Sequence, residues 1–303
     1  MGGTNGTTPG ATAGALAALC GEAERIGAGA LWSVDHLFWP RPLLECLTTL
    51  TVAATATERV VIGSCVLQLP LRSPPAVAKQ AAAISLLSGG RFVLGVGVGR
   101  HRGEYAAAGV DFSARGRLTD EGIAALRRAW GHEGAPAAPY VQAPPSPPVP
   151  VWVGGSSDAA LARAATAGDG WIPLFVPAGS YAGRLDDLAR RAERHGRAPD
   201  EVVPAAVALV RVGGPEALAD GTGWLSSLYG LPPAAFERHL IAGSPEACAD
   251  GVVAYLDAGA HHVAVMVAGD QALEAFSALV DALGAGHRRG RDQSNRRQLE
   301  VTR

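Results

Sequence analysis

The stretch that decides the fold is ERVVIGSCVLQLPLRSPPAVAKQAAAISLLSGGRFVLGVGVG, residues 58–99. It begins with an apolar, β-branched run over 59–67 and ends with a second apolar run over 91–98. Runs without polar alternation are typical of strands that are covered on both faces, as in parallel sheets. Between the runs, Ser73 followed by Pro74 predicts a helix start, and a Gly-Gly pair predicts the helix end. The stretch therefore predicts a strand–helix–strand unit.

The same alternation extends over the rest of the chain, with residues 213–244 less regular. Strands separated by helices imply parallel pairing with right-handed crossovers. We therefore expect an α/β fold, a TIM-type (β/α)8 barrel, for which 303 residues are sufficient. Apolar residues at helical spacing predict further helices over 11–28, 41–57, 115–130, 157–167, 180–197, 245–258 and 270–284. Seven strands are predicted, the other five at 30–34, 149–154, 170–175, 202–212 and 262–267.

A closed barrel of this class has eight strands, one more than the sequence predicts. The absent strand would precede the helix over 11–28, where residues 1–10 read MGGTNGTTPG. Gly, Pro and Asn are depleted in buried strands, so this segment is not expected to form one. We expect a barrel whose first strand is missing or truncated, which leaves two strand edges unpaired.

One barrel domain is expected over residues 1–285. The Pro-rich segment 135–150 could pass for a domain linker, but the alternation resumes directly after it. We interpret it as a long loop from a strand to a helix that crosses the barrel mouth. Residues 286–303 are basic and poor in apolar side chains, which predicts a disordered tail rather than a nucleic-acid-binding arm.

Composition and cysteine usage narrow the class of protein. The net charge is −2 and hydrophobic residues make up 48% of the chain, so we expect a large core and no nucleic-acid partner. No leader peptide or bilayer-spanning apolar run is found. The cysteines are too far apart for a metal site, at Cys20, Cys46, Cys65 and Cys248. These features predict a cytoplasmic, metal-free protein with reduced thiols.

Barrel active sites lie at the C-terminal ends of strands, and polar or glycine-rich signals mark several of the predicted ends. Asp35 and His36 follow the first predicted strand. An imidazole exchanges a proton near neutral pH, so His36 is a candidate catalytic residue. The alternative is an Asp that caps the next turn beside a packed His. Cys65, in the second strand, is interpreted as a core thiol rather than a nucleophile.

Glycines end the strand over 91–98, at Gly97 and Gly99, and Arg100 follows them. Glycine lets a backbone approach a flat ring or a phosphate without a Cβ clash. The spacing is not that of a dinucleotide-binding fingerprint, which needs a different third glycine and a later acidic residue. Arg72 could meet an anionic group of a substrate or cofactor, or could be an ordinary surface arginine.

Residues 154–157, GGSS, open a predicted helix. Free backbone N–H groups at a helix start, together with hydroxyl groups, form an anion site. The alternative is simple helix capping by Ser156 or Ser157.

Taken together, five blocks of the sequence resemble the bacterial luciferase-like superfamily, most closely its F420-dependent branch. The resemblance runs from about residue 15 to residue 284 and implies a (β/α)8 barrel with insertions, usually dimeric. The chain departs from the family at its N-terminus, where a short apolar strand is expected. The blocks are LWSVDHLF (31–38), the stretch 58–99, GRLTDEGIAALRRAW (116–130), PVPVWVGGSS (148–157) and GDGWIP (168–173).

The resemblance implies roles for the candidate residues. His36 would stabilise or protonate the reacting centre, and Asp35 would contact the cofactor ring. A bulge with a non-proline cis peptide bond, which falls at Ser64-Cys65, would back that ring. In members that oxidise sugar phosphates, an acidic residue can follow the strand-end glycines. Arg100 stands there in this chain, which favours an anionic ligand or a different role for this position. The implied cofactor contacts are Asp35, Ser64, Cys65, Gly97, Gly99, Arg100, Gly154, Gly155 and Ser156, with the phosphate at the last three.

Three functions follow as hypotheses. The first is F420-dependent hydride transfer to or from a small organic substrate by a homodimeric enzyme. The second keeps the fold but uses reduced FMN and dioxygen, as monooxygenases of the superfamily do. Such enzymes often need a long mobile lid that keeps water away from the flavin. The segments of this chain are short, which counts mildly against this second hypothesis. The third is a cofactor-free binding or structural subunit.

Overall fold

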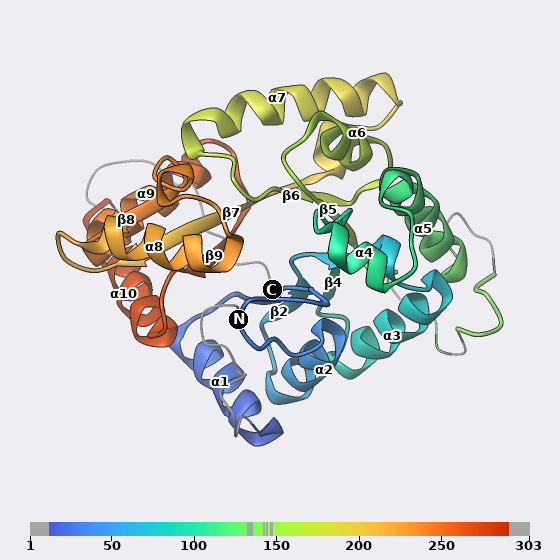
Figure 1. The fold of residues 1–303 in the computed structure, drawn as a ribbon, viewed down its shortest axis with the longest axis horizontal. Coiled ribbons are helices and arrows are strands. Elements are labelled where there is room, and N and C mark those ends of the chain that lie inside the picture. The colour runs from blue at the N-terminus through green and yellow to red at the C-terminus, as the bar shows by residue number, and fades with distance from the viewer. Residues whose placement is uncertain (1–11, 132–135, 142, 144, 146–147, 291–303) are drawn as a thin grey trace.

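A computed structural model of the chain describes residues 12–131, 136–141, 143, 145 and 148–290. Within these residues the strands form one parallel sheet that curls into a nearly closed barrel, and most of the helices surround it (Figure 1). The strands are β1 (Ala30–Ser33), β2 (Val61–Ser64), β3 (Leu67–Gln68), β4 (Phe92–Gly97), β5 (Val151–Gly154), β6 (Gly170–Ile172), β7 (Val203–Val212), β8 (Leu240–Gly243) and β9 (His262–Val267). The α/β barrel class predicted from the sequence is confirmed.

The helices begin and end close to the positions that the sequence predicts. Thr12 caps α1 by accepting a hydrogen bond from the Ala15 N–H at 3.2 Å, and Gly27 ends it in the left-handed region at φ 112°. Ser73 stands at the start of α3 but makes no side-chain capping bond, so only the Pro74 part of that expectation is confirmed. The helices are α1 (Ala13–Ile26), α2 (Cys46–Ala56), α3 (Pro74–Leu87), α4 (Arg102–Ala107), α5 (Arg115–Ala129), α6 (Asp158–Ala167), α7 (Ala178–Arg194), α8 (Ala217–Tyr229), α9 (Pro245–Asp257) and α10 (Ala272–Gly290).

Every strand pair is parallel, and the ring runs β1-β2-β4-β5-β6-β7-β9. The short β3 continues the line of β2 and pairs with the end of β4, through Leu67 opposite Val96. β8 pairs with the last four residues of β7. Between β7 and α9, α8 and β8 therefore form an insertion at the C-terminal end of β7, which is the barrel mouth.

The ring is open at one place, between the outer edges of β1 and β9, and we call this gap the seam. Among the described residues, β1 pairs only with β2, β9 pairs only with β7, and no strand precedes α1. The helix layer is continuous here, because α1 contacts α10 across the seam. The gap expected from the missing first strand is therefore observed, while residues 1–11 lie outside the described part of the chain.

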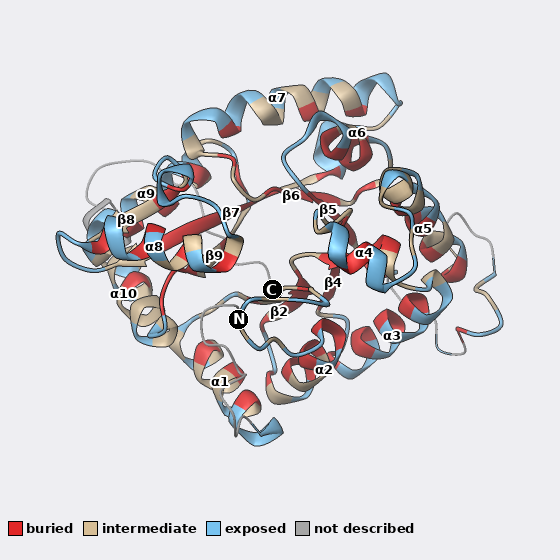
Figure 2. Cartoon of the chain, viewed as in Figure 1, coloured by how far each residue is buried: buried red, intermediate tan, exposed pale blue. Residues whose placement is uncertain are grey.

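Burial follows the same pattern (Figure 2). Every residue of β4, in the middle of the sheet, is buried. In β9 four of six residues are only partly buried, and β1 alternates between partly buried and buried. The strands beside the seam are thus the least covered part of the ring.

Two tryptophans fill the barrel interior, and glycines make the room for them. The rings of Trp32 and Trp152 lie 5.4 Å apart. A Cβ at Gly63 would come within 2.4 Å of the Trp32 ring, and a Cβ at Gly170 within 2.6 Å of the Trp152 ring. Neither position has a left-handed φ, so glycine is needed here for space and not for backbone conformation.

Charged side chains satisfy the backbone at the opposite, N-terminal end of the barrel. Glu24 accepts hydrogen bonds from the N–H groups of residues 58–60, which lead into β2. Arg91, directly before β4, donates to the carbonyl oxygens of Ala54, Thr57 and Val60. These contacts pair strand-entry and helix-end groups that would otherwise be unsatisfied.

The structure differs from the expectations at five places. The region 213–244 contains α8 and β8, and the single strand expected over 59–67 is broken into β2 and β3. The short α4 was not expected at all. The Pro-rich segment connects α5 to β5, so its described part enters a strand from the N-terminal side and does not cross the mouth. Of the expected tail, residues 286–290 belong to α10, and residues 291–303 lie outside the described residues.

Gly170→Ala should destabilise the barrel because the new methyl group would press on the buried Trp152 ring. Overpacking a core typically costs about 1–3 kcal/mol in the free energy of unfolding, which urea denaturation measures. Gly179→Ala is the matched control, since a Cβ there would meet nothing within 4 Å in α7. Equal stability of the two variants would contradict the proposed role of the glycine.

Candidate functional site

The C-terminal ends of β1, β3 and β4 converge at the barrel mouth. Asp35 and His36 follow β1, Gln68 ends β3, and α4 begins shortly after β4. Residues far apart in the sequence meet here because parallel strands present their C-terminal ends on one rim. The two residues predicted after β1 are therefore in one cluster with two that were not predicted, Gln68 and Glu104.

Glu104, on α4, is the centre of this cluster and is fully buried. Its Oε1 accepts hydrogen bonds from the backbone N–H groups of Leu37 at 2.6 Å and Phe38 at 3.2 Å. The Gln68 side-chain amide donates to both carboxylate oxygens, at 3.3 and 3.2 Å. A buried carboxylate is costly unless it is hydrogen-bonded. These donors meet that need and fix the loop after β1 to α4.

His36 is held by the same carboxylate, its Nδ1 lying 3.2 Å from Glu104 Oε1. Its ring stacks on Trp39, with centroids 4.2 Å apart and planes inclined by 22°, and meets His101 edge-on at 5.5 Å. Burial lowers the pKa of His36, and the Glu104 carboxylate opposes this shift. With Nδ1 engaged by Glu104, Nε2 is the nitrogen left for proton exchange with a bound molecule.

Asp35 and Arg72 are committed to contacts within the protein. Asp35 accepts from the Gln68 N–H at 2.9 Å and from the Arg72 guanidinium at 2.5 Å. Arg72 also pairs with Glu45 at 2.9 Å. Burial raises the pKa of Asp35, and Arg72 and the Gln68 N–H oppose the increase. Both residues support the end of β1, and a direct contact of either with a ligand stays a prediction.

The bulge expected in the second strand lies between β2 and β3. Its cis peptide bond joins Cys65 and Val66, so the position expected from the resemblance, Ser64-Cys65, is wrong by one residue. The Ser64 hydroxyl is buried and donates to the Gly95 carbonyl at 2.8 Å. Burial raises the pKa of Cys65 to about 12, which supports its interpretation as an unreactive thiol.

The strand-end glycines surround the bulge. A Cβ at Gly97 would lie 2.6 Å from the Val66 side chain, and one at Gly154 would lie 2.7 Å from it. A Cβ at Gly99 would meet the Gln68 amide oxygen at 2.0 Å. These glycines make room for the protein's own side chains, a reason that the sequence did not indicate. Their contact with a cofactor stays a prediction.

Gly155 and Ser156 are exposed at the start of α6. Ser157, and not Ser156, caps the helix by accepting from the Ala160 N–H at 3.2 Å. Arg184 of α7 donates to the Ser156 carbonyl at 3.0 Å, which places a guanidinium beside this helix start. The site predicted for a phosphate thus has an exposed helix N-terminus and a neighbouring cation.

The loop after β1 is joined to α8 across the mouth. Trp39 meets Tyr229 edge-on at 5.6 Å, and the Arg41 guanidinium carbon lies 5.2 Å from the Trp224 ring. Arg41 also pairs with Asp270, between β9 and α10, at 2.7 Å. These contacts connect the two sides of the seam at the mouth.

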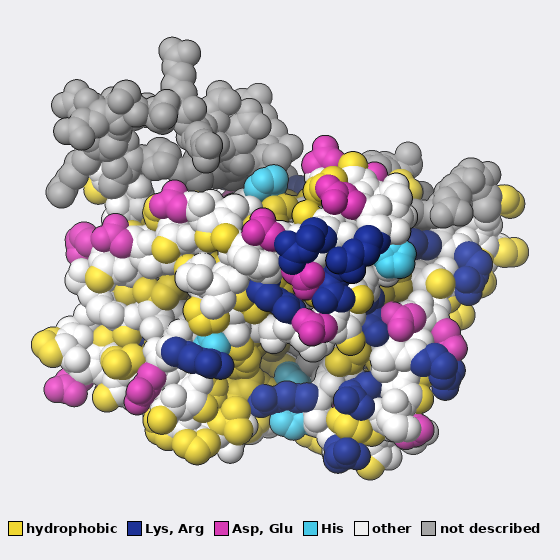
Figure 3. All heavy atoms as spheres, turned by 90° about the horizontal axis from the view of Figure 1, so that it is seen from above, with side chains coloured by type: hydrophobic (Ala, Val, Ile, Leu, Met, Phe, Trp, Pro, Cys, Tyr) yellow, Lys and Arg dark blue, Asp and Glu magenta, His cyan; other side chains and the backbone are white. Residues whose placement is uncertain are grey.

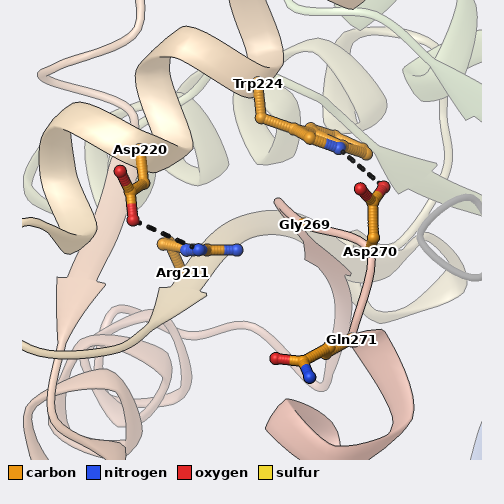
Figure 4. A pocket seen from close by; sticks show the side chains of 6 residues that line it. All are labelled: Arg211, Asp220, Trp224, Gly269, Asp270 and Gln271. Carbon is orange, nitrogen blue, oxygen red and sulfur yellow. Dashed lines mark hydrogen bonds and ion pairs between the residues drawn. The ribbon is translucent and has the colours of Figure 1, made fainter.

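A polar pocket of about 480 Å³ lies beside this connection (Figure 4). Its charged groups are paired with neighbours, since Arg211 reaches Asp220 at 3.3 Å and Asp270 accepts from Trp224 as well as from Arg41. We therefore assign no ligand to it. The pocket is lined by Arg211, Asp220, Trp224, Gly269, Asp270 and Gln271.

On the side of the molecule above α7, basic side chains gather with acidic ones among them (Figure 3). Arg190 and Arg191 pair with Asp187, and Arg184 pairs with Asp158. Among the described residues no group of three potential ligands could hold a metal ion. None of the described helices is long and apolar enough to cross a membrane.

The sequence missed Glu104, Gln68 and Arg184. Glu104 lies on a helix of six residues, too short to show an apolar period. Gln68 directly follows the strand predicted over 59–67, and Arg184 is one of several arginines on α7. The only available signal for Glu104 was an acidic residue soon after a glycine-rich strand end.

A family model described as luciferase-like monooxygenase matches residues 2–220. F420-dependent glucose-6-phosphate dehydrogenase of Amycolatopsis mediterranei is 34% identical over 169 residues, which cover 50% of this chain and 50% of that protein. The chain spans about half the length of the curated relatives it matches.

Two solved structures show the same fold. One is an F420-dependent secondary alcohol dehydrogenase in complex with an F420-acetone adduct, with a TM-score of 0.78 and 17% identity over 89% of this chain and 94% of the other. The second is a monooxygenase from Streptomyces bottropensis, with a TM-score of 0.74 and 21% identity over 94% of this chain and 96% of the other.

Glu104→Gln should lower the pKa of His36 further, because the carboxylate charge that favours the imidazolium is lost. The pKa is measured by NMR titration of the His36 ring proton. Unfolding should also become easier by about 1–3 kcal/mol, because buried hydrogen bonds to a charged group are weakened. Glu45→Gln is the control, since it removes a nearby charge that His36 does not contact. A pKa of His36 that rises or stays constant would refute the role of Glu104.

Proposed function

Because the chain belongs to the luciferase-like monooxygenase family, we propose that it is an oxidoreductase that binds a deazaflavin or flavin at the barrel mouth, with F420 the favoured cofactor. The observation that carries the proposal is His36, held by the buried Glu104 carboxylate where the ends of β1, β3 and β4 converge. A fixed imidazole at this rim suits proton exchange beside a redox ring.

The residues at the bulge fit a flat ring. Cys65 and Val66 are partly exposed, and Gly97 and Gly154 pack against Val66 without side chains of their own. The bulge and the glycines at the ends of β4 and β5 thus bring little side-chain volume to this place, which suits a planar group. Cys65, Val66 and the strand-end glycines are therefore our candidates for contact with the ring.

The start of α6 fits the phosphate that both F420 and FMN carry. Gly155 and Ser156 are exposed, and Arg184 stands beside them. An anion at a helix N-terminus is stabilised by free N–H groups and by the helix dipole. We propose Gly154, Gly155 and Ser156 as the phosphate contacts, while Arg184, which pairs with Asp158 at 2.8 Å, holds the Ser156 carbonyl in place.

When bound, F420 or a flavin supplies hydride or electron transfer, and the chain supplies position and protonation. Glu104 holds His36 at Nδ1, so that Nε2 gives or takes the proton of the substrate. The lowered pKa of His36 favours the neutral imidazole at neutral pH, which suits acceptance of a proton during oxidation of an alcohol. Trp39 keeps the imidazole plane in place by stacking.

Reduced FMN with dioxygen is the second candidate, supported by the similarity of fold to a monooxygenase. The phosphate site serves either cofactor, so separate titrations must distinguish them. We also propose a homodimer, which the resemblance implies, and a cytoplasmic location, which the cysteine usage predicts. Sedimentation equilibrium of the purified chain tests the first of these.

Purified protein should bind F420 or FMN, measured by the change in cofactor absorbance and fluorescence on titration. Ser156→Asp should weaken binding because it places a carboxylate at the proposed phosphate site. Ser180→Asp adds the same charge at the start of α7 and should leave affinity unchanged. If the protein binds neither F420 nor FMN, both enzyme hypotheses are rejected and a cofactor-free subunit is favoured. Equal effects of the two substitutions would reject only the phosphate position.

His36→Ala should reduce turnover by about 10²–10⁴-fold while cofactor affinity stays close to wild type, since general acid–base catalysis contributes this much. The assay follows oxidation of reduced F420 with a panel of ketones and aldehydes. His195→Ala, at the exposed end of α7, is the control. Wild-type turnover by the His36 variant would show that the imidazole does not handle the proton.

A further inference from the structure

An aromatic wall leads from His36 to a guanidinium across the barrel mouth. His36 stacks on Trp39, and Trp39 meets the edge of Tyr229 at 5.6 Å. The Arg100 guanidinium carbon lies 5.2 Å from the Tyr229 ring. The four side chains come from the loop after β1, the end of α8 and the end of β4. They form a continuous surface beside the imidazole.

Arg100 carries a charge that no carboxylate neutralises among the described residues. Two other arginines near this rim are paired, Arg72 with Asp35 and Arg41 with Asp270. Arg100 contacts the Tyr229 ring face, and no described residue accepts a hydrogen bond from it. Its planar set of N–H donors is therefore available to a carboxylate or phosphate, which it can bind through two hydrogen bonds.

Tyr229 provides a second donor at the same place. Burial raises the pKa of its phenol to about 12, so the hydroxyl keeps its proton at neutral pH. Its acceptor in the structure is the Met266 thioether sulfur at 4.0 Å, a weak acceptor. A partly buried hydroxyl with so weak a partner gains by donating to a stronger acceptor, and an anionic oxygen is one.

The Tyr229 ring is surrounded by other aromatic rings. Phe175 meets the Tyr229 ring at 5.5 Å, and Phe236 lies 5.7 Å from it. Phe175 adopts a left-handed backbone conformation, with φ 63°, that non-glycine residues rarely take. Aromatic rings favour edge-on or offset contact with another planar group.

We propose that the substrate has a planar apolar body and an anionic group, the body lying along Trp39 and Tyr229 and the anion meeting Arg100 and the Tyr229 hydroxyl. This inference rests on the proposed function, because it places the substrate beside His36. It assigns Arg100 to the substrate and not to the phosphate of the cofactor, which the start of α6 holds.

The test compares 2-naphthoate with its neutral analogue 2-naphthamide by calorimetric titration of the full chain, with and without F420. Wild type should bind the carboxylate more tightly by about 10–100-fold, the range expected for hydrogen bonds to a charged group. Arg100→Gln should abolish this preference and leave the affinity for F420 unchanged. Tyr229→Phe should reduce the preference in part, because only the hydroxyl is lost.

Arg102→Gln is the matched control, since Arg102 also lies over an aromatic ring, that of Phe112, without an ion pair. It should keep the preference for 2-naphthoate. Equal binding of the two probes to wild type, or a preference that survives in Arg100→Gln, overturns the inference. Loss of F420 affinity in Arg100→Gln with the preference retained assigns Arg100 to the cofactor instead. If wild type binds 2-naphthoate preferentially but no cofactor, the proposed function fails while the anion site stands.

Discussion

The barrel mouth depends on one buried carboxylate. Glu104 accepts hydrogen bonds from two backbone N–H groups of the loop after β1, from the Gln68 side chain and from His36. It therefore joins the ends of β1, β3 and β4, which are far apart in the sequence. A carboxylate taken out of water loses several kcal/mol of hydration, which only such a set of donors offsets. The chemistry proposed for His36 follows from this support, because an imidazole that must exchange a proton in one direction needs its other nitrogen fixed.

Glycines have a different meaning in the structure from the one the sequence suggested. Gly97 and Gly154 mark strand ends as a cofactor-binding pattern would, yet each makes room for Val66. Gly63 and Gly170 do the same for Trp32 and Trp152 inside the barrel. The absence of a side chain at these positions therefore serves internal packing.

The sequence predicted the barrel because its strands are continuous apolar runs separated by amphipathic helices, and this pattern depends only on which faces are buried. It did not predict α4, since six residues carry no period, nor β8, whose four residues pair only with the end of β7. The Pro-rich segment was assigned to the wrong end because composition indicates a loop without its direction. Of the site, His36 was found as a polar residue at a strand end, while Glu104 could be recognised only after folding had brought α4 beside β1.

The seam gives the molecule a mechanical property that a closed barrel lacks. A ring that is open at one place has two free strand edges, which can move apart without breaking any hydrogen bond between strands. Among the described residues, α1 contacts α10 on the helix side of the seam, and on the mouth side Arg41 pairs with Asp270 and Trp39 meets Tyr229. Beside the imidazole the seam is thus bridged by side chains and, among the described residues, not by hydrogen bonds between strands.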